Sequence, residues 1–374
     1  MTDTTQYRIG IILAGGSGER FWPLSRRTRP KQLLRLTSET KTMLDEAVER
    51  LTPLIPAEHM YVITGEHLVE PIRACNSGLL SENIIAEPAK RNTTGALCYA
   101  IAHILAKYNV PEKCVTLAVV TADHQIGEAE RFRATMFAAL RHAEAHESIV
   151  TIGIAPTRPE TGYGYIQARE LAPAVDGLSQ SIQVHHVSAF HEKPNRQRAE
   201  DFMNAGNYFW NSGMFFWTAK TFLDELSHAH PPSAETYSKL IAAFKTGDLA
   251  EARRIFETLE DISIDYALME HAQKVLVVRA DFPWDDVGAW TALERSHPAD
   301  AQGNVKLGEP VVVESKDCIV YNTVGPEKMA VSVIGCEELV VIVTADAVLV
   351  MPKEKAQDVR HAVSELKKRN APQL

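Results

Sequence analysis

The sequence predicts an α/β protein in which a mainly parallel sheet, covered by helices, is followed by a small strand-rich unit. Short apolar runs that are typical of buried strands alternate with segments whose apolar residues recur at helical spacing. This alternation indicates a parallel sheet with helices on both faces. The expected strands are residues 8–13, 59–63, 115–120 and 149–154. In such sheets, ligands gather beyond the carboxyl ends of the strands.

Two helices are expected between these strands. One places apolar residues on a single helical face, at positions 43, 44, 47, 48 and 51. The other does so at positions 97, 101, 104 and 105. Asn92, Thr93 and Thr94 open the second helix, and their side chains are suited to an N-cap.

The composition changes near residues 298–304, and a second unit is expected beyond that point. Short β-branched runs separated by turn residues follow, at residues 310–313, 318–321, 330–334, 339–343 and 347–350. A charged helical segment runs from Pro352 to about Lys368. We therefore predict a large domain over residues 1–300 and a small strand-rich domain with a closing helix over residues 304–374.

The most informative segment is the glycine-rich connection after the first strand. Residues 14–18 read Ala-Gly-Gly-Ser-Gly, so this loop has almost no side chains and its N–H groups can approach an anion closely. Arg20 and Lys31 add two cations to the same connection. The segment matches no Walker A loop, and Phe21 stands where the dinucleotide fingerprint requires its third glycine. A phosphate-handling loop is the first hypothesis, and a structural glycine turn is the alternative.

Composition limits the possible functions. The net charge of −9 argues against a broad nucleic-acid interface, and no apolar stretch reaches the length of a membrane span. The first residues, Met1 to Gln6, show no signal-peptide pattern. Five scattered cysteines without a Cys-x-x-Cys spacing indicate neither a zinc site nor a disulfide framework. A cytoplasmic protein with reduced thiols is the expectation.

Eight ordered sequence blocks resemble one enzyme family, the sugar-1-phosphate nucleotidyltransferases. The first block is Leu-Ala-Gly-Gly-x-Gly-x-Arg with the later Pro and Pro-Lys, at residues 13–32. The others are residues 87–93, 122–124, 162–166, 190–194, 210–215, 263–267 and 284–290. Together they span most of the chain. Residues 21–25 and 30–32 most resemble the members that use GTP and mannose 1-phosphate.

The resemblance implies a fold and an assembly. The family has a Rossmann-like, mixed but mostly parallel sheet of the glycosyltransferase-A kind. Its C-terminal unit is similar to a left-handed β-helix and supports a homodimer. Longer members carry a further sugar-isomerase domain, which is not expected here, since this sequence stops short of one.

The resemblance also implies the residues that bind the nucleotide and the metal. Arg20 and Lys31 match residues that act on the phosphates, and Asp123 and Asp286 match the ligands of Mg²⁺, a cofactor that takes one or two carboxylates together with phosphate oxygens. Asp285 remains an alternative to Asp286. The expected nucleotide-binding residues are Leu13, Ala14, Gly15, Gly16, Ser17, Gly18, Glu87 and Asn92.

Within this set, Glu87 is the candidate reader of guanine, because a carboxylate can accept from both N1–H and N2–H₂. Arg91 and Asn92 could serve the base, a phosphate or the loop itself, and local helix capping is the alternative for this segment. His124 is expected to be a structural neighbour of Asp123.

A third set of residues matches the family's sugar-phosphate site. It comprises Gly164, Glu192, Lys193, Asn211 and Asp265. A glycine lets the sugar approach the backbone, Glu192 can hold hydroxyls, and Lys193 supplies a charge for the phosphate. Structural alternatives exist for each: a plain turn for Gly164, a surface ion pair for Glu192 and Lys193, and a helix cap for Asp265.

The expected reaction is transfer of GMP from GTP to α-D-mannose 1-phosphate, with release of pyrophosphate. The sugar phosphate is already ionised, so positioning and charge neutralisation are sufficient and no general base is needed. Three alternatives remain: the same chemistry on a heptose or glucose phosphate, a dehydrogenase, and a silent nucleotide-sugar sensor.

Overall fold

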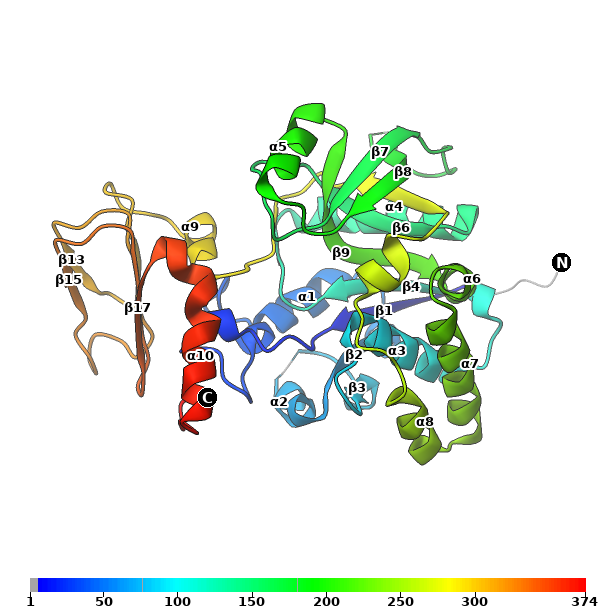
Figure 1. Cartoon of the computed structure of the whole chain (residues 1–374), viewed down its shortest axis with the longest axis horizontal. Coiled ribbons are helices and arrows are strands. Elements are labelled where there is room, and N and C mark those ends of the chain that lie inside the picture. Colours follow the sequence, from blue (N-terminus) through cyan, green and yellow to red (C-terminus); the bar gives the residue numbers. More distant parts are fainter. Residues whose placement is uncertain (1–5, 76, 180) are drawn as a thin grey trace.

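The computed structural model describes residues 6–75, 77–179 and 181–374. In this part of the chain, nine strands form one sheet in the order β3-β2-β1-β4-β9-β6-β10-β8-β7 (Figure 1). The strands are β1 (Tyr7–Leu13), β2 (Met60–Gly65), β3 (Ile84–Glu87), β4 (Val115–Thr121), β6 (Ile149–Ile154), β7 (Tyr165–Leu171), β8 (Val184–His191), β9 (Tyr208–Thr218) and β10 (Val275–Arg279).

The sheet is mixed, and most strands point in one direction. The β1 strand runs parallel to β2 and β4, β2 parallel to β3, and β6 parallel to β10. Of the nine strands, only β8 and β9 run opposite to the majority direction. The predicted Rossmann-like, mostly parallel fold class is therefore confirmed. The expected parallel strands at 8–13, 59–63, 115–120 and 149–154 all belong to the majority direction.

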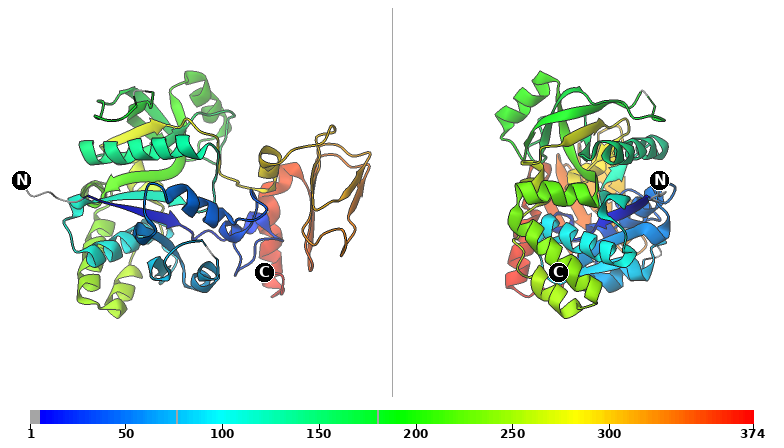
Figure 2. Two further views of the ribbon diagram at one scale, coloured as in Figure 1. Left: turned by 180° about the vertical axis from the view of Figure 1, so that it is seen from behind. Right: turned by 90° about the vertical axis from the view of Figure 1, so that its right-hand side faces the viewer.

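Helices cover both faces of this sheet. On β1, Ile9 and Ile11 enter one core with α3 and α7, whereas Ile12 enters a second core with α1 and α4. Figure 2 shows α1 and α4 on the near side of the sheet when the molecule is seen from behind. The helices are α1 (Met43–Leu51), α2 (Val69–Arg73), α3 (Asn92–Tyr108), α4 (Ala129–His146), α5 (Arg196–Ala205), α6 (Ala219–Ala229), α7 (Pro231–Thr246), α8 (Leu249–Phe256), α9 (Leu293–Ser296) and α10 (Val359–Lys368).

The two predicted helices begin where expected, but one cap differs. Thr42 caps α1 with a reciprocal pair of bonds to Asp45. The N-cap position of α3 is Arg91, and no side chain caps that helix. The Asn92 side chain accepts from the neighbouring Thr93 N–H at 3.0 Å, and the Thr93 hydroxyl accepts a tertiary hydrogen bond from the Ile264 N–H at 2.8 Å.

The C-terminal strands form a short parallel β-helix-like unit at one end of the molecule (Figure 1). The β12, β14 and β16 strands are parallel in one sheet, which β17 closes in antiparallel fashion, and β13 pairs in parallel with β15 in a second sheet. These strands are β12 (Val305–Leu307), β13 (Val311–Val313), β14 (Ile319–Asn322), β15 (Ser332–Ile334), β16 (Leu339–Val343) and β17 (Val348–Pro352).

A shared apolar core joins this unit to the glycine-rich connection. Phe21 and Trp22 pack in one cluster with Trp290 and with Val359 and Val363 of α10. The Trp22 indole N–H also donates to the carbonyl of Gln373 at 2.9 Å. The division of the chain into 1–300 and 304–374 remains a prediction, and the two parts bury side chains against each other. No helix in the described ranges is long and apolar enough to cross a membrane.

Candidate active site

The glycine-rich loop follows β1 at the carboxyl edge of the sheet, as the sequence predicts. Gly15, Gly16 and Ser17 are exposed, whereas the Ala14 carbonyl is fixed by hydrogen bonds from the side chains of Gln32 and Thr64. Gly18 adopts φ +61°, and a Cβ added there would lie 2.5 Å from the Cβ of Lys31. This glycine therefore permits both the left-handed turn and the close passage of Lys31 beneath the loop.

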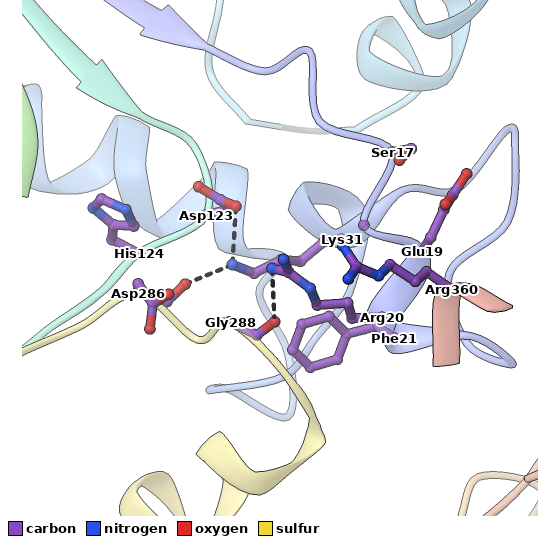
Figure 3. Close-up of a pocket in the computed structure, with 11 residues that line it drawn as sticks. Ser17, Glu19, Arg20, Phe21, Lys31, Asp123, His124, Asp286, Gly288 and Arg360 are labelled. Atoms are coloured by element: carbon purple, nitrogen blue, oxygen red, sulfur yellow. Dashed lines mark hydrogen bonds and ion pairs between the residues drawn. The ribbon is translucent and has the colours of Figure 1, made fainter. Parts of the chain in front are cut away.

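A cavity of about 350 Å³, which we call the phosphate cavity, lies beside this loop (Figure 3). All four predicted catalytic residues, Arg20, Lys31, Asp123 and Asp286, line it. They come from the glycine-rich connection, from the end of β4 and from the loop after β11 (Trp284–Asp285). The full lining is Ser17, Gly18, Glu19, Arg20, Phe21, Lys31, Asp123, His124, Asp286, Gly288 and Arg360.

Lys31 is the buried cation of this cavity. Its Nζ donates to Oδ2 of Asp123 at 2.9 Å and to the backbone carbonyl of Asp286 at 2.6 Å. Burial raises the pKa of Asp123, but the Lys31 ammonium, His124 and hydrogen bonds to the carboxylate together lower it below the usual value. Asp123 is therefore ionised at neutral pH and paired with Lys31.

The loops that carry Asp123 and Asp286 are joined directly. The β5 strand (Gln125–Ile126) pairs with β11, and the Trp284 indole N–H donates to Nδ1 of His124 at 3.2 Å. Burial lowers the pKa of His124 to about 4, so the ring is neutral and can accept this bond. His124 thus has the structural position that the sequence suggested.

The geometry distinguishes Asp285 from Asp286. Both carboxylate oxygens of Asp285 accept hydrogen bonds from Arg295, and one also accepts from the Val287 N–H. Asp286 instead lines the phosphate cavity, and its Oδ1 accepts a 2.5 Å bond from the Tyr163 hydroxyl. Buried Val287, between Asp286 and Gly288, has φ +47°, an unfavourable value for a β-branched residue.

The donor set of this cavity fits magnesium. The described residues contain no cluster of three or more histidine, cysteine or acidic side chains suited to a metal ion. Mg²⁺ needs only one or two carboxylates when substrate phosphates and waters complete its shell. Asp123 and Asp286 line one cavity next to a loop of exposed backbone amides, and this arrangement meets that requirement.

A larger cavity of about 1110 Å³, the nucleotide cavity, adjoins the phosphate cavity. Ser17, Glu19 and Asp123 line both. Of the eight residues predicted to bind nucleotide, Gly18 lines the phosphate cavity, Ser17 lines both, and the nucleotide cavity takes the others: Leu13, Ala14, Gly15, Gly16, Glu87 and Asn92.

Glu87 lines the nucleotide cavity at the end of β3, and its Oε1 would lie 3.4 Å from a Cβ added at Gly15. Burial raises the pKa of its carboxyl to about 7. Neighbouring Asn92 lines the same cavity, whereas Arg91 is turned away and donates to the Glu257 carbonyl at 2.7 Å. The other guanidinium bond of Arg91 goes to the Lys90 carbonyl, so the contacts found for Arg91 are with the backbone around it.

The five residues predicted for the sugar phosphate lie together in a second cluster. Asn211 donates to Asp265 at 3.0 Å, and the Lys193 ammonium pairs with Glu192. A Cβ added at Gly164 would lie 2.6 Å from Oε2 of Glu192, so a side chain there would displace that carboxylate. Burial raises the pKa of Asp265 to about 6, and Glu192 adds to that effect. Asn211 lies within β9.

Tyr163 connects the sugar cluster to the phosphate cavity. It precedes Gly164 in the chain, and its hydroxyl bonds Asp286. Burial is the main cause that raises the pKa of Tyr163, so the phenol is protonated and donates. The side chain also receives a hydrogen bond from Arg158 at 3.2 Å.

Sequence reasoning missed four residues of this region: Tyr163, Arg295, Arg360 and Lys90, which lines the nucleotide cavity. Tyr163 and Lys90 stand inside two of the blocks quoted above, so their position in a motif could have identified them. Arg295 and Arg360 belong to segments without a motif. Only their contact with Asp285 and with the phosphate cavity reveals them.

Comparison with known proteins identifies the family of this chain. Residues 9–303 match the family described as nucleotidyl transferase, and residues 308–366 match a "MannoseP isomerase/GMP-like beta-helix domain". A mannose-1-phosphate guanylyltransferase of Klebsiella pneumoniae is 39% identical over 96% of this chain and 74% of its own length. The alginate biosynthesis protein AlgA of Pseudomonas aeruginosa is 38% identical over 96% of this chain and 72% of its own.

The solved structures include a protein titled mannose-1-phosphate geranyltransferase from Thermus thermophilus. It has a TM-score of 0.83 and 35% identity, and the match covers 97% of this chain and 100% of that one. The similarity includes the nucleotidyl transferase part and the C-terminal β-helix. The chain therefore belongs to the nucleotidyl transferase family, in the group of the mannose-1-phosphate guanylyltransferases.

Proposed function

We propose that this enzyme transfers GMP from GTP to α-D-mannose 1-phosphate and releases pyrophosphate. One observation carries the proposal: Arg20, Lys31, Asp123 and Asp286 line a single cavity that adjoins a larger one containing the glycine loop and Glu87. The names of the relatives support mannose 1-phosphate as the acceptor.

In this proposal the phosphate of the sugar attacks the α-phosphorus of GTP in line. A bond forms between a sugar-phosphate oxygen and the α-phosphorus, and the bond from the α-phosphorus to the β-bridging oxygen breaks. The backbone of residues 15–18 cradles the triphosphate, and Arg20 binds the β- and γ-phosphates. Lys31, held between Asp123 and Asp286, stabilises charge at the α-phosphate.

Asp123 and Asp286 would hold Mg²⁺, which would neutralise phosphate charge when bound. Glu87 would accept from the guanine N1–H and N2–H₂ groups. Gly164, Glu192, Lys193, Asn211 and Asp265 would hold the sugar phosphate. The 3.0 Å bond between Asn211 and Asp265 supports this assignment, because it orients two groups that can bind hydroxyls.

The proposal includes a homodimer in the cytoplasm, with no nucleic-acid or membrane partner. Six of the ten exposed large apolar residues of the described chain lie in the β-helix unit: Val311, Val313, Met329, Ile334, Val348 and Val350. Such a concentration of apolar surface favours self-association. Sedimentation of the wild type and of Ile334→Lys tests this part, since a monomeric wild type contradicts it.

The decisive experiment measures pyrophosphate release from mannose 1-phosphate, Mg²⁺ and each of the four nucleoside triphosphates in turn. Release with GTP alone supports the reaction, the base and the sugar together. Release with a different nucleotide contradicts the role of Glu87. Silence with all four directs the assay to heptose and glucose phosphates. Binding of these substrates without pyrophosphate release would favour the nucleotide-sugar sensor. No observation in the site supports that alternative.

A further inference from the structure

One side chain of the C-terminal unit reaches the phosphate cavity. Arg360 stands in the first turn of α10 and lines the cavity together with Arg20 and Lys31. Figure 3 shows its guanidinium extending from α10 toward that of Arg20. The other residues lining this cavity lie between Ser17 and Gly288, so Arg360 is the contribution of the β-helix unit.

Burial fixes the position of α10 against the glycine-rich connection. Val359 and Val363 are each 3% exposed and pack in the core that contains Phe21 and Trp22. The ammonium of Lys367 pairs with Glu19 near the other end of the helix. Arg360 lies seven residues before Lys367, which is about two helical turns. The two side chains therefore leave the helix on the same side.

The charges around the cavity leave two guanidinium groups without a counterion. Of its three carboxylates, Asp123 pairs with Lys31 and Glu19 with Lys367, while Asp286 accepts from Tyr163. Arg20 makes one long hydrogen bond, 3.5 Å to the Gly288 carbonyl. Arg360 has no ion pair or side-chain hydrogen bond with any other described residue.

Two unpaired guanidinium groups that face one cavity repel each other, and a shared anion would relieve that repulsion. The planar, five-donor guanidinium fork matches phosphate geometry better than an ammonium does. In the view of Figure 3, Arg20 lies between Arg360 on one side and Asp123 and Asp286 on the other. An anion held by both guanidinium groups would lie on the side of the cavity toward α10.

We infer that Arg360 is a further phosphate-binding residue, which with Arg20 holds the terminal phosphates of the nucleotide and the pyrophosphate that leaves. The identity of the nucleotide rests on the proposed function, whereas the anion site rests on the geometry alone. The β-helix unit would then complete the active site in addition to any role in assembly.

Calorimetric binding of GTP, GMP and inorganic pyrophosphate to the full-length protein tests the inference. Arg360→Ala should weaken the binding of GTP and of pyrophosphate by about tenfold, because a charge-assisted hydrogen bond is lost. GMP lacks the terminal phosphates, so its affinity should be unchanged. Arg360→Lys should keep part of the affinity. Arg369→Ala is the matched control, since Arg369 follows the same helix, is exposed and lines neither cavity.

Steady-state kinetics give a second readout: Arg360→Ala should raise KM for GTP and leave KM for mannose 1-phosphate unchanged. The inference is overturned if Arg360→Ala binds pyrophosphate as Arg369→Ala does, if it weakens GMP as much as GTP, or if the wild type binds no pyrophosphate. The proposed function can fail separately. Loss of pyrophosphate binding in Arg360→Ala, with no turnover of mannose 1-phosphate by the wild type, would retain the anion site and reject the reaction.

Discussion

The Nζ of Lys31 lies 2.9 Å from Oδ2 of Asp123, in a contact between residues 92 positions apart. The same ammonium donates to the carbonyl of Asp286, 255 positions away. One buried cation therefore ties the glycine-rich connection to both loops that carry the proposed metal ligands. Its removal should affect chemistry and stability together, unlike the removal of exposed Arg20.

Lys31→Ala and Arg20→Ala should each lower kcat by about a hundredfold or more, because each removes a charge that stabilises the transition state. Only Lys31→Ala should also reduce the free energy of unfolding, by about 1–3 kcal/mol, since its side chain is buried and its loss leaves Asp123 unpaired. Pyrophosphate release and thermal melting measure the two effects. Near-normal turnover in either variant contradicts the assigned role.

Asp285→Asn and Asp286→Asn should separate a structural carboxylate from a metal-binding one. Asp286→Asn should raise the Mg²⁺ concentration needed for half-maximal rate by at least about tenfold. Asp285→Asn should leave that concentration unchanged and lower the melting temperature, because the bidentate contact with Arg295 weakens. Mg²⁺ titration of the rate decides between them. The reverse pattern would make Asp285 the ligand.

Binding of GTP should strengthen as the pH rises through about 7. The pKa of Glu87 is raised to about 7, so in the free enzyme this carboxyl is mostly protonated at pH 6 and mostly ionised at pH 8. The ionised form accepts at both oxygens and is the form that guanine would favour. Glu87→Gln should weaken the binding of GTP by about tenfold at pH 8 and by less at pH 6.

The ratio of wild-type to Glu87→Gln affinity is the quantity to plot against pH, because the titration of the nucleotide's phosphates cancels in it. A ratio that does not change between pH 6 and 8 would contradict a role of Glu87 in base recognition.

Gly18→Ala should displace Lys31 and reduce turnover. Its φ of +61° disfavours a side chain, and the added Cβ would meet the Lys31 Cβ at 2.5 Å. Gly206→Ala is the matched control, since Gly206 has φ +73° with no atom within 4 Å of the added Cβ. Both should lose about 1 kcal/mol of stability from backbone strain. Only Gly18→Ala should lose activity, and equal activities would show that the contact with Lys31 is unimportant.

The local features of this protein could be predicted from the sequence. The period of apolar residues gave the strand at 149–154 and the helix at 43–51 at the bounds that the structure has, because these patterns depend on neighbours a few residues apart. The glycine loop with Arg20 and Lys31 was equally readable, since small residues and cations in one short connection have a direct chemical meaning.

Other features required the fold. The Thr93 hydroxyl bonds Ile264 and does not cap α3, and Arg295 binds the carboxylate of Asp285 while Asp286 lines the phosphate cavity. These partners lie far apart or outside any motif. No pattern within a short window encodes which of two adjacent carboxylates faces a cavity.

The sequence by itself determined the α/β class, the phosphate-handling loop and the candidate ligands, because residue type and short-range spacing specify these. The tertiary structure decided which loops meet. Lys31 lies between Asp123 and the carbonyl of Asp286. Arg360 reaches the same cavity because Val359 and Val363 of its helix pack against Phe21 and Trp22. Burial of apolar surface is favourable against any partner that excludes water. It therefore requires no fixed spacing between the two segments in the sequence.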